Sequence, residues 1–116
     1  MFRTVAYGLL ALAVIAGASL RIDGARAAED PTFRIEFKDG AVTPREIIVP
    51  ANARIRLELV NTGDTPAEFE SLELKKEKVL APKASSVLVI RTLAPGRYDF
   101  FDDFHPGQPP AVLIAK

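Results

Sequence analysis

The sequence predicts an all-β fold, a Greek-key β-sandwich of about seven short strands. Apolar and polar residues alternate along residues 29–116, and no segment keeps a helical period over a useful length. Proline, glycine, asparagine or aspartate interrupts this pattern about every ten residues. A Pro-Gly-x-Tyr sequence at Pro95–Tyr98 is typical of a corner in which a tyrosine hydroxyl bonds nearby backbone.

The first half of this region contains the clearest alternation. Residues Thr32–Lys38 place Phe33, Ile35 and Phe37 on one face of a strand, with charged residues on the other. A turn follows at Asp39-Gly40. The other strands predicted in this half are Ile47–Val49, Arg54–Asn61 and a weaker, glutamate-rich segment at Ala67–Leu74.

The second half contains three predicted strands and one charged edge. Ser85–Thr92 is a continuous apolar run, which predicts a strand covered on both faces. The mixed-charge stretch Glu73–Lys78 predicts a solvated edge, where lysines discourage pairing with other chains. The last two strands are expected at Arg97–Phe101 and Ala111–Ala115. Core or lid packing is expected for the aromatic residues Phe100, Phe101 and Phe104.

Residues 1–28 have the pattern of a secretory signal peptide, which leaves one exported domain at residues 29–116. Arg3 precedes an apolar run at Val5–Leu20, and Ala25-Arg26-Ala27 provides a small-x-small cleavage site. The apolar run is shorter than the ~20 residues of a usual membrane span. We therefore expect a periplasmic protein that does not insert into the membrane after cleavage. An uncleaved anchor is the alternative.

Composition excludes several classes of function. Residues 29–116 carry 12 basic and 14 acidic residues, a net charge of about −2, so no electrostatic attraction to nucleic acid is expected. The chain has no cysteine, and its single methionine is Met1, which excludes disulfides and a blue-copper site. It also lacks a G-x-S-x-G nucleophile motif and a phosphate-binding glycine loop.

Two acidic clusters are candidates for a metal site. The first contains Glu68 and Glu70, and the second contains Asp102 and Asp103 with His105, the only histidine. Loops gather at the two ends of a Greek-key sandwich, so both clusters can meet there. Gathered carboxylates repel one another unless a cation or water offsets the repulsion. Oxygen donors with one imidazole suit Fe(II), Mn(II), Zn(II) or Cu(II). The alternative is a solvated acidic surface with a loop histidine.

The order of these motifs resembles a bacterial cupredoxin-like domain over nearly all of residues 29–116. An Asn-Thr-Gly turn at 61–63 precedes Glu-Phe-Glu, and Leu-x-Pro-Gly-x-Tyr-x-Phe at 93–100 precedes the histidine loop. The resemblance places the first histidine ligand of blue-copper relatives at or near Glu68. It places their cysteine at Asp102 and their second histidine at His105. Their methionine position falls within Gly107–Pro110 and is empty.

Within this family the sequence resembles the sulfur-poor branch, which includes the EfeO-type cupredoxin domain and the FtrB-type subunit of ferrous-iron uptake systems. The resemblance is carried by Glu-Phe-Glu-Ser at 68–71, Glu-Lys-Val at 77–79 and Asp-Phe-His-Pro at 103–106. It implies a periplasmic partner of a membrane iron permease and of other iron-uptake components. Such a partner binds copper or iron and assists Fe(II) oxidation or delivery, without being a stand-alone enzyme. The implied ligands are Glu68, Glu70, Asp102, Asp103 and His105, with Glu77 as a weaker addition.

Two other functions agree with the same residues. One is a periplasmic copper carrier without redox work, which an Fe(II) oxidation assay with and without bound copper would separate from the first. The other is a metal-free β-sandwich that acts as an interaction module, for which no divalent ion should raise the melting temperature.

Overall fold

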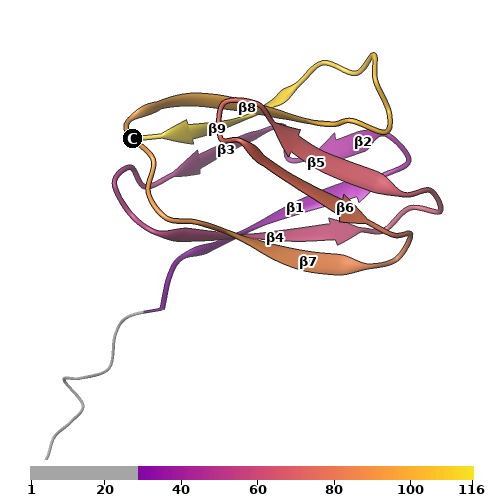
Figure 1. The fold of residues 1–116 in the computed structure, drawn as a ribbon, viewed down its shortest axis with the longest axis horizontal. Coiled ribbons are helices and arrows are strands. Elements are labelled where there is room, and N and C mark those ends of the chain that lie inside the picture. The colour runs from indigo at the N-terminus through magenta and orange to yellow at the C-terminus, as the bar shows by residue number, and fades with distance from the viewer. Residues whose placement is uncertain (1–28) are drawn as a thin grey trace, which may run out of the picture.

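A computed structural model describes residues 29–116, which form nine strands and no helix (Figure 1). The predicted signal peptide, residues 1–28, lies outside the described residues. In chain order the strands are β1 Thr32–Lys38, β2 Ala41–Thr43, β3 Glu46–Val49, β4 Ile55–Asn61, β5 Ala67–Ser71, β6 Lys76–Leu80, β7 Ser85–Ile90, β8 Gly96–Asp102 and β9 Ala111–Ala115.

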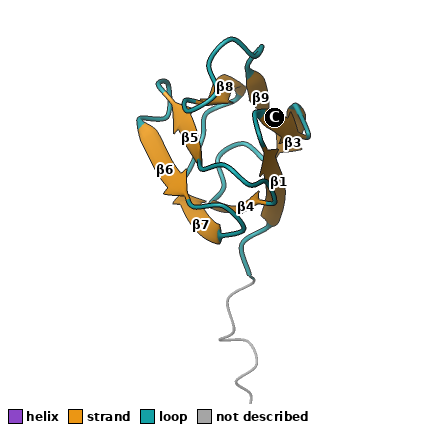
Figure 2. Cartoon of the chain, turned by 90° about the vertical axis from the view of Figure 1, so that its right-hand side faces the viewer, coloured by secondary structure: helices purple, strands orange, loops and turns teal. Residues whose placement is uncertain are grey.

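The strands form two sheets that pack face to face, as the views in Figures 1 and 2 show. One sheet has the order β2-β1-β4-β7, and the other has the order β3-β9-β8-β5-β6. The pairs β1–β4 and β3–β9 are parallel, and the other pairs are antiparallel. The chain crosses from one sheet to the other five times, between β2 and β3, β3 and β4, β4 and β5, β6 and β7, and β7 and β8. The predicted all-β sandwich is confirmed.

The core lies between the sheets, where the inward residues of alternating strands meet. In β4 the residues Ile55, Leu57 and Leu59 are fully buried and alternate with partly exposed polar residues. The rings of Phe69 and Phe100 stack with centroids 5.1 Å apart, which joins β5 to β8. Each large apolar side chain buried in this way stabilises the fold by about 1.5–3 kcal/mol.

The tyrosine corner is also confirmed. The Tyr98 hydroxyl donates a hydrogen bond to the carbonyl oxygen of Ala94 at 2.7 Å. Tyr98 lies near the start of β8, whereas the loop that contains His105 follows the end of that strand. The corner therefore stabilises the end of the sandwich that is remote from the histidine loop.

Three expectations differ in part from the structure. The apolar run at Ser85–Thr92 forms an edge strand, β7, that ends at Ile90 and leaves Val87 42% exposed. An apolar run does not show whether a second layer or neighbour covers it, and no strand within residues 29–116 pairs with the outer edge of β7. Phe104 is 45% exposed and is not core, because it lies in the turn beyond β8. The weak strand expected at Ala67–Leu74 ends at Ser71.

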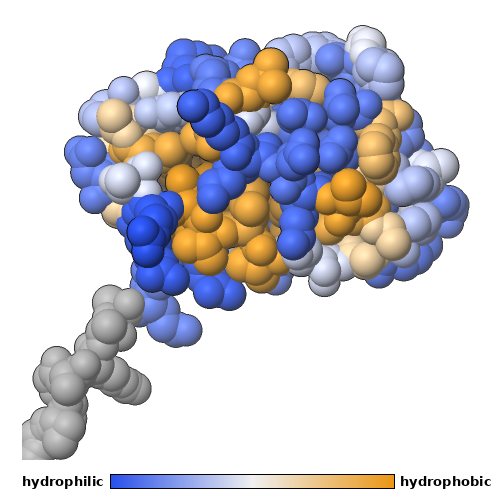
Figure 3. Space-filling view, in the orientation of Figure 1, coloured by the Kyte–Doolittle hydropathy of each residue, from blue (hydrophilic) through white to orange (hydrophobic). Residues whose placement is uncertain are grey.

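The charged segment after β5 forms a strand of its own, which sequence periodicity did not identify. This strand, β6, is an edge of the five-stranded sheet and carries Lys76, Glu77 and Lys78. The expected solvated edge is confirmed, although as a strand. Figure 3 shows hydrophobic side chains among hydrophilic ones on the face that Figure 1 presents. None of the described residues forms a helix long and apolar enough to cross a membrane.

Candidate metal centre

Three carboxylates gather on the outer face of the five-stranded sheet. Strand β5 alternates, so that Ala67 and Phe69 are buried while Glu68 and Glu70 face outward. Asp103 follows the end of β8 directly and is exposed. One carboxylate oxygen from each of Glu68, Glu70 and Asp103 lies within 4.8 Å of the other two. This spacing allows one cation to contact all three.

Backbone and side-chain hydrogen bonds bring the two acidic segments together. The Asp103 amide donates to the Glu68 carbonyl at 2.9 Å, and the Glu68 amide donates to Oδ1 of Asp102 at 2.9 Å. Glu68 and Asp102 are 34 positions apart in the chain. The antiparallel pairing of β5 with β8 sets this register, with Phe69 opposite Asp102. The two acidic clusters were expected to meet. The structure shows this for the carboxylates of Glu68, Glu70 and Asp103.

The electrostatics of the group show that its negative charges are poorly compensated. Partial burial is the largest cause that raises the pKa of the Glu68 carboxyl. The charges of Glu77, Glu70 and Asp103 raise this pKa further, in that order. The pKa of Glu70 is raised for the same reasons, first by burial and then by Asp103 and Glu77. A bound cation would reverse both effects, because it favours the charged carboxylates.

Glu77 lies beside this group without belonging to it. It is exposed on β6 and pairs across the strands with Glu70. Its charge contributes to the raised pKa of Glu68 and of Glu70. It therefore adds negative potential near the three carboxylates, while its oxygens lie outside the 4.8 Å group.

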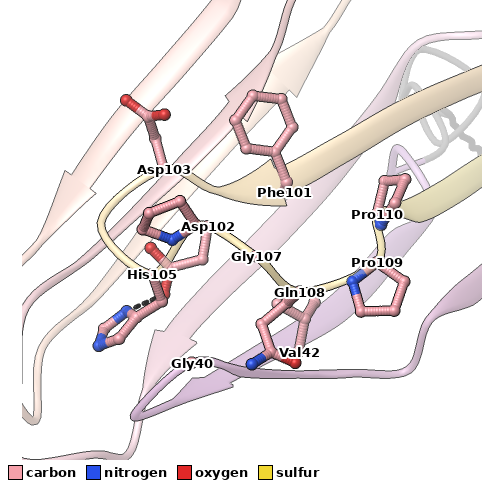
Figure 4. A pocket seen from close by; sticks show the side chains of 11 residues that line it. Gly40, Val42, Phe101, Asp102, Asp103, His105, Gly107, Gln108, Pro109 and Pro110 are labelled. Atoms are coloured by element: carbon pink, nitrogen blue, oxygen red, sulfur yellow. Dashed lines mark hydrogen bonds and ion pairs between the residues drawn. The ribbon is translucent and has the colours of Figure 1, made fainter.

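Asp102 and His105 form a separate arrangement. The Asp102 side chain is 1% exposed, and its Oδ1 accepts hydrogen bonds from the Glu68 amide at 2.9 Å and the Phe104 amide at 3.0 Å. Its Oδ2 lies 2.7 Å from Nδ1 of His105. Figure 4 shows the Asp103 side chain pointing away from the His105 ring, on the other side of the loop. The structure thus does not place Asp102 or His105 in the acidic group.

The second ring nitrogen of His105 also has a partner, which sequence reasoning did not identify. Nε2 lies 3.1 Å from the Thr65 hydroxyl, and this hydroxyl donates to Oδ1 of Asp39 at 2.8 Å. The Asp64 amide donates to the same Asp39 oxygen at 3.0 Å. The hydrogen bonds from Thr65 and Asp64 lower the pKa of Asp39. In the sequence Asp39 had only a turn signal and Thr65 had no signal, because their contacts join segments far apart in the chain.

Asn61 holds the loop between β4 and β5 in the shape that presents Thr65. Its side chain is buried and donates to the carbonyls of Thr65 at 2.8 Å and Ala81 at 3.1 Å. Its Oδ1 accepts from the Gly63 amide at 3.0 Å. A buried asparagine with its amide and carbonyl satisfied is stabilising, whereas an unsatisfied one would cost about 1–3 kcal/mol. The Asn-Thr-Gly motif is therefore a structural element of the loop.

The loop after β8 covers a small cavity of about 290 Å³. Residues on its wall include Val42, Phe101 and Pro110, with the polar Asp102 and His105 at one side (Figure 4). The guanidinium of Arg45, in the connection between β2 and β3, donates to the Pro109 carbonyl at 2.8 Å. This hydrogen bond attaches the last part of the loop to the connection between β2 and β3.

These features define the class of the protein as a cupredoxin-type sandwich without sulfur ligands. Residues 6–115 match the cupredoxin-like domain family, and the chain belongs to that family.

One relative in sequence is uncharacterized protein RP394 of Rickettsia prowazekii (strain Madrid E). The two are 40% identical over 83 residues, which cover 72% of this chain and 66% of that protein, slightly less than two thirds of its length.

Solved structures of low sequence identity share the fold. Reduced auracyanin from Roseiflexus castenholzii has a TM-score of 0.62 at 18% identity, and the match covers 77% of this chain and 99% of that chain. The metal-binding domain of the Cu(I)-exporting P-type ATPase CopA from Streptococcus pneumoniae D39 has a TM-score of 0.65 at 13% identity. That match covers 78% of this chain and 91% of the other.

The residues of this chain do not fit the copper group of blue-copper proteins. Such a group requires a cysteine thiolate, and this chain has none. At the position that the resemblance assigns to this cysteine, Asp102 already accepts three hydrogen bonds. The three outer carboxylates suit a different kind of ion, because oxygen donors favour hard or borderline divalent cations.

Proposed function

We propose that this cupredoxin-like protein is exported and binds a copper or iron ion at Glu68, Glu70 and Asp103, in support of ferrous-iron uptake. The observation that carries the metal site is the convergence of three carboxylate oxygens within 4.8 Å of one another. Raised pKa values at Glu68 and Glu70 support it, because burial and then the neighbouring carboxylates disfavour the charged forms, which a cation would favour. Membership of the cupredoxin-like family agrees with a metal-binding role in general, although Glu70 and Asp103 lie outside the positions that the resemblance assigns to the blue-copper ligands.

The donor set favours some ions over others. Cu(I) prefers thiolate and thioether ligands, whereas carboxylates favour harder ions such as Fe(II), Mn(II) and Cu(II). Anionic oxygen donors stabilise ferric iron more than ferrous iron, so a bound iron would be easier to oxidise. The three carboxylates would hold the ion on the outer face of the five-stranded sheet, where a partner protein can approach. Glu77 would add attraction for the incoming cation.

The role in iron uptake rests on the resemblance to EfeO-type and FtrB-type proteins. In this proposal the partner is a membrane iron permease, together with other periplasmic iron-uptake components. The protein would deliver the ion or assist its oxidation, and it would not act as a stand-alone enzyme. An exposed site agrees with delivery, since a carrier must release its ion to a partner.

Isothermal titration calorimetry with Cu²⁺, and with Fe²⁺ without oxygen, tests the metal site. We expect about one ion per chain in the purified protein. The triple variant Glu68→Gln, Glu70→Gln, Asp103→Asn should bind at least 100-fold more weakly, because it keeps the shape of the site and removes its charge. Glu46→Gln, on the exposed side of β3, is the matched control and should not change affinity. Equal affinities in the triple variant and the unaltered protein would refute the site.

Two further measurements test the role of the site. Fe(II) oxidation by the copper-loaded protein separates redox assistance from simple copper carriage, in which the rate equals that of free copper. Co-purification with an iron permease tests the partner. If both measurements fail while metal binding is intact, the protein is a metal carrier without a role in iron uptake.

A further inference from the structure

We infer that Asp102 and His105 form a metal-free clamp that joins three loops, at the position where blue-copper relatives bind their ion. This assignment differs from the expectation that both residues are metal ligands. It does not depend on the proposed site at the outer carboxylates. Four features of the described residues support it.

The first feature is the saturation of Asp102. Its Oδ1 accepts from two backbone amides, those of Glu68 and Phe104, and its Oδ2 accepts from His105. A buried carboxylate keeps its charge when several donors point at it. A metal ion at Oδ2 would have to displace the imidazole hydrogen bond at 2.7 Å. Asp102 therefore connects the end of β8 to β5 and to the histidine without a metal.

The second feature is the use of both nitrogens of His105. A carboxylate only accepts hydrogen bonds, so Nδ1 carries the hydrogen that bonds Asp102. Nε2 faces the Thr65 hydroxyl at 3.1 Å. That hydroxyl also donates to Oδ1 of Asp39 at 2.8 Å, so it links Nε2 to the β1–β2 turn. Both ring nitrogens therefore already have partners within the protein, and an ion could bind either one only by displacing that partner.

The third feature is the close backbone packing around the clamp. A Cβ atom at Gly40 would lie 3.4 Å from both Cβ and Cγ of His105, and Gly40 has a φ of +96°, which favours glycine. A Cβ atom at Gly63 would lie 2.7 Å from the Asp39 backbone nitrogen, which is a clash. The two glycines therefore allow the β1–β2 turn to contact both the histidine and the β4–β5 loop.

The fourth feature is the direction of the neighbouring side chains. Asp103 points to the opposite side of the loop from His105 (Figure 4). An ion held by the outer carboxylates is thus separated from the imidazole by the loop backbone and by Asp102. It follows that any ion bound at the outer carboxylates has a shell without histidine nitrogen.

Nuclear magnetic resonance of the imidazole ring tests the clamp directly, because the chain has a single histidine. In the protein treated with EDTA, we expect a hydrogen on Nδ1 that exchanges slowly with water. Addition of Zn²⁺ should leave both ring ¹⁵N shifts unchanged. An Nδ1 without hydrogen in the metal-free protein, or a ring ¹⁵N shift that follows Zn²⁺ binding, would overturn the clamp.

Thermal unfolding provides a second test. Thr65→Val keeps the shape of the side chain and removes the hydroxyl between His105 and Asp39, and it should lower the melting temperature by ~4–8 °C. The shift should be the same in EDTA and in excess Zn²⁺. The exposed Thr92→Val is the matched control and should change the melting temperature by less than about 2 °C. A shift for Thr65→Val that appears only with Zn²⁺ would contradict the clamp.

The two tests separate this inference from the proposed function. If calorimetry finds no bound ion, the metal site fails, whereas the slow Nδ1 hydrogen and the Thr65→Val shift still support the clamp. If Zn²⁺ binds and moves the ring shifts, the clamp fails and metal binding stands with a different set of ligands.

Discussion

Asp102 and Asp103 are adjacent in the chain and have opposite environments. Asp102 is 4% exposed and accepts hydrogen bonds from two amides and a histidine. Asp103 is exposed and lies beside Glu68 and Glu70, whose pKa values are raised. The inner carboxylate is compensated by donors of the protein, whereas the outer carboxylates lack such compensation. The comparison teaches that acidic residues in one short segment can serve structure and ligand binding separately.

The strand geometry explains this division. Successive residues of β8 point to opposite faces of the sheet, and this alternation continues into the first residue of the loop. Asp102 therefore points to the interior, and Asp103 points to the outer face that also carries Glu68 and Glu70. The five predictions below test this contrast between the inner and outer carboxylates, in order of decreasing effect.

The largest effect is expected for Asp102→Ala. Two backbone amides and the His105 ring would lose their acceptor inside the protein, which should lower the free energy of unfolding by roughly 2–4 kcal/mol. Asp103→Ala removes an exposed carboxylate and should change it by less than about 0.5 kcal/mol. Denaturant unfolding in EDTA measures both. Similar losses for the two variants would show that the inner and outer carboxylates do not differ in structural role.

The second effect is the pH dependence of the outer group. Because the folded protein raises the pKa of Glu68 and Glu70, it binds protons more tightly than the unfolded chain does. The stability of the metal-free protein should therefore fall as the pH rises above the ordinary glutamate value of 4.5 through the raised pKa values. Glu68→Gln with Glu70→Gln should flatten this part of the profile, measured by thermal unfolding. A metal affinity that rises about tenfold per pH unit is expected where one proton is released.

Asp39, which binds the Thr65 hydroxyl beside the clamp, should show the opposite pH dependence of stability. Its pKa is lowered, first by the Thr65 hydroxyl, so its contribution to stability is present above the ordinary value of 3.8. That contribution should be lost as the pH falls through the lowered pKa. Asp39→Asn should remove this acid-side loss and leave the change above pH 4.5 intact. If Asp39→Asn also changes the dependence of stability on pH above 4.5, the titrations of Asp39 and of the outer carboxylates are coupled.

A smaller effect is expected at the other end of β8. Tyr98→Phe removes the hydrogen bond to Ala94, which should lower the free energy of unfolding by about 1 kcal/mol. Calorimetric affinity for Cu²⁺ should remain unchanged, since Tyr98 lies far along the strand from the carboxylates. This variant shows whether a loss of stability alone weakens binding. If Tyr98→Phe also loses affinity for Cu²⁺, the loss of stability would equally explain weaker binding by the acidic variants.

The smallest effect is expected for Glu77→Gln. Glu77 acts on Glu68 and Glu70 by charge alone and is exposed, so its removal should weaken ion binding by no more than about five-fold. High salt should reduce this difference further. A loss as large as that of Glu68→Gln would place Glu77 among the ligands.

Much of the fold could be predicted from local patterns. Alternation identified β1 and β9 with their observed bounds, and the Pro-Gly-x-Tyr sequence identified the corner at Tyr98. The short strand β2 and the charged strand β6 were missed, because few or no apolar residues alternate there. The exposure of Val87 was missed, because an apolar run does not show whether the strand lies at an edge.

The sequence by itself determined that this domain is an all-β sandwich and that no thiolate can bind a metal in it. Period-two alternation and the absence of cysteine are local facts that need no partner. Only the tertiary structure decided which acids meet, because the pairing of β5 with β8 places Glu68 and Glu70 beside Asp103. Core packing of Phe69 on Phe100 accompanies that register, and a shift of one residue would exchange the inner and outer faces.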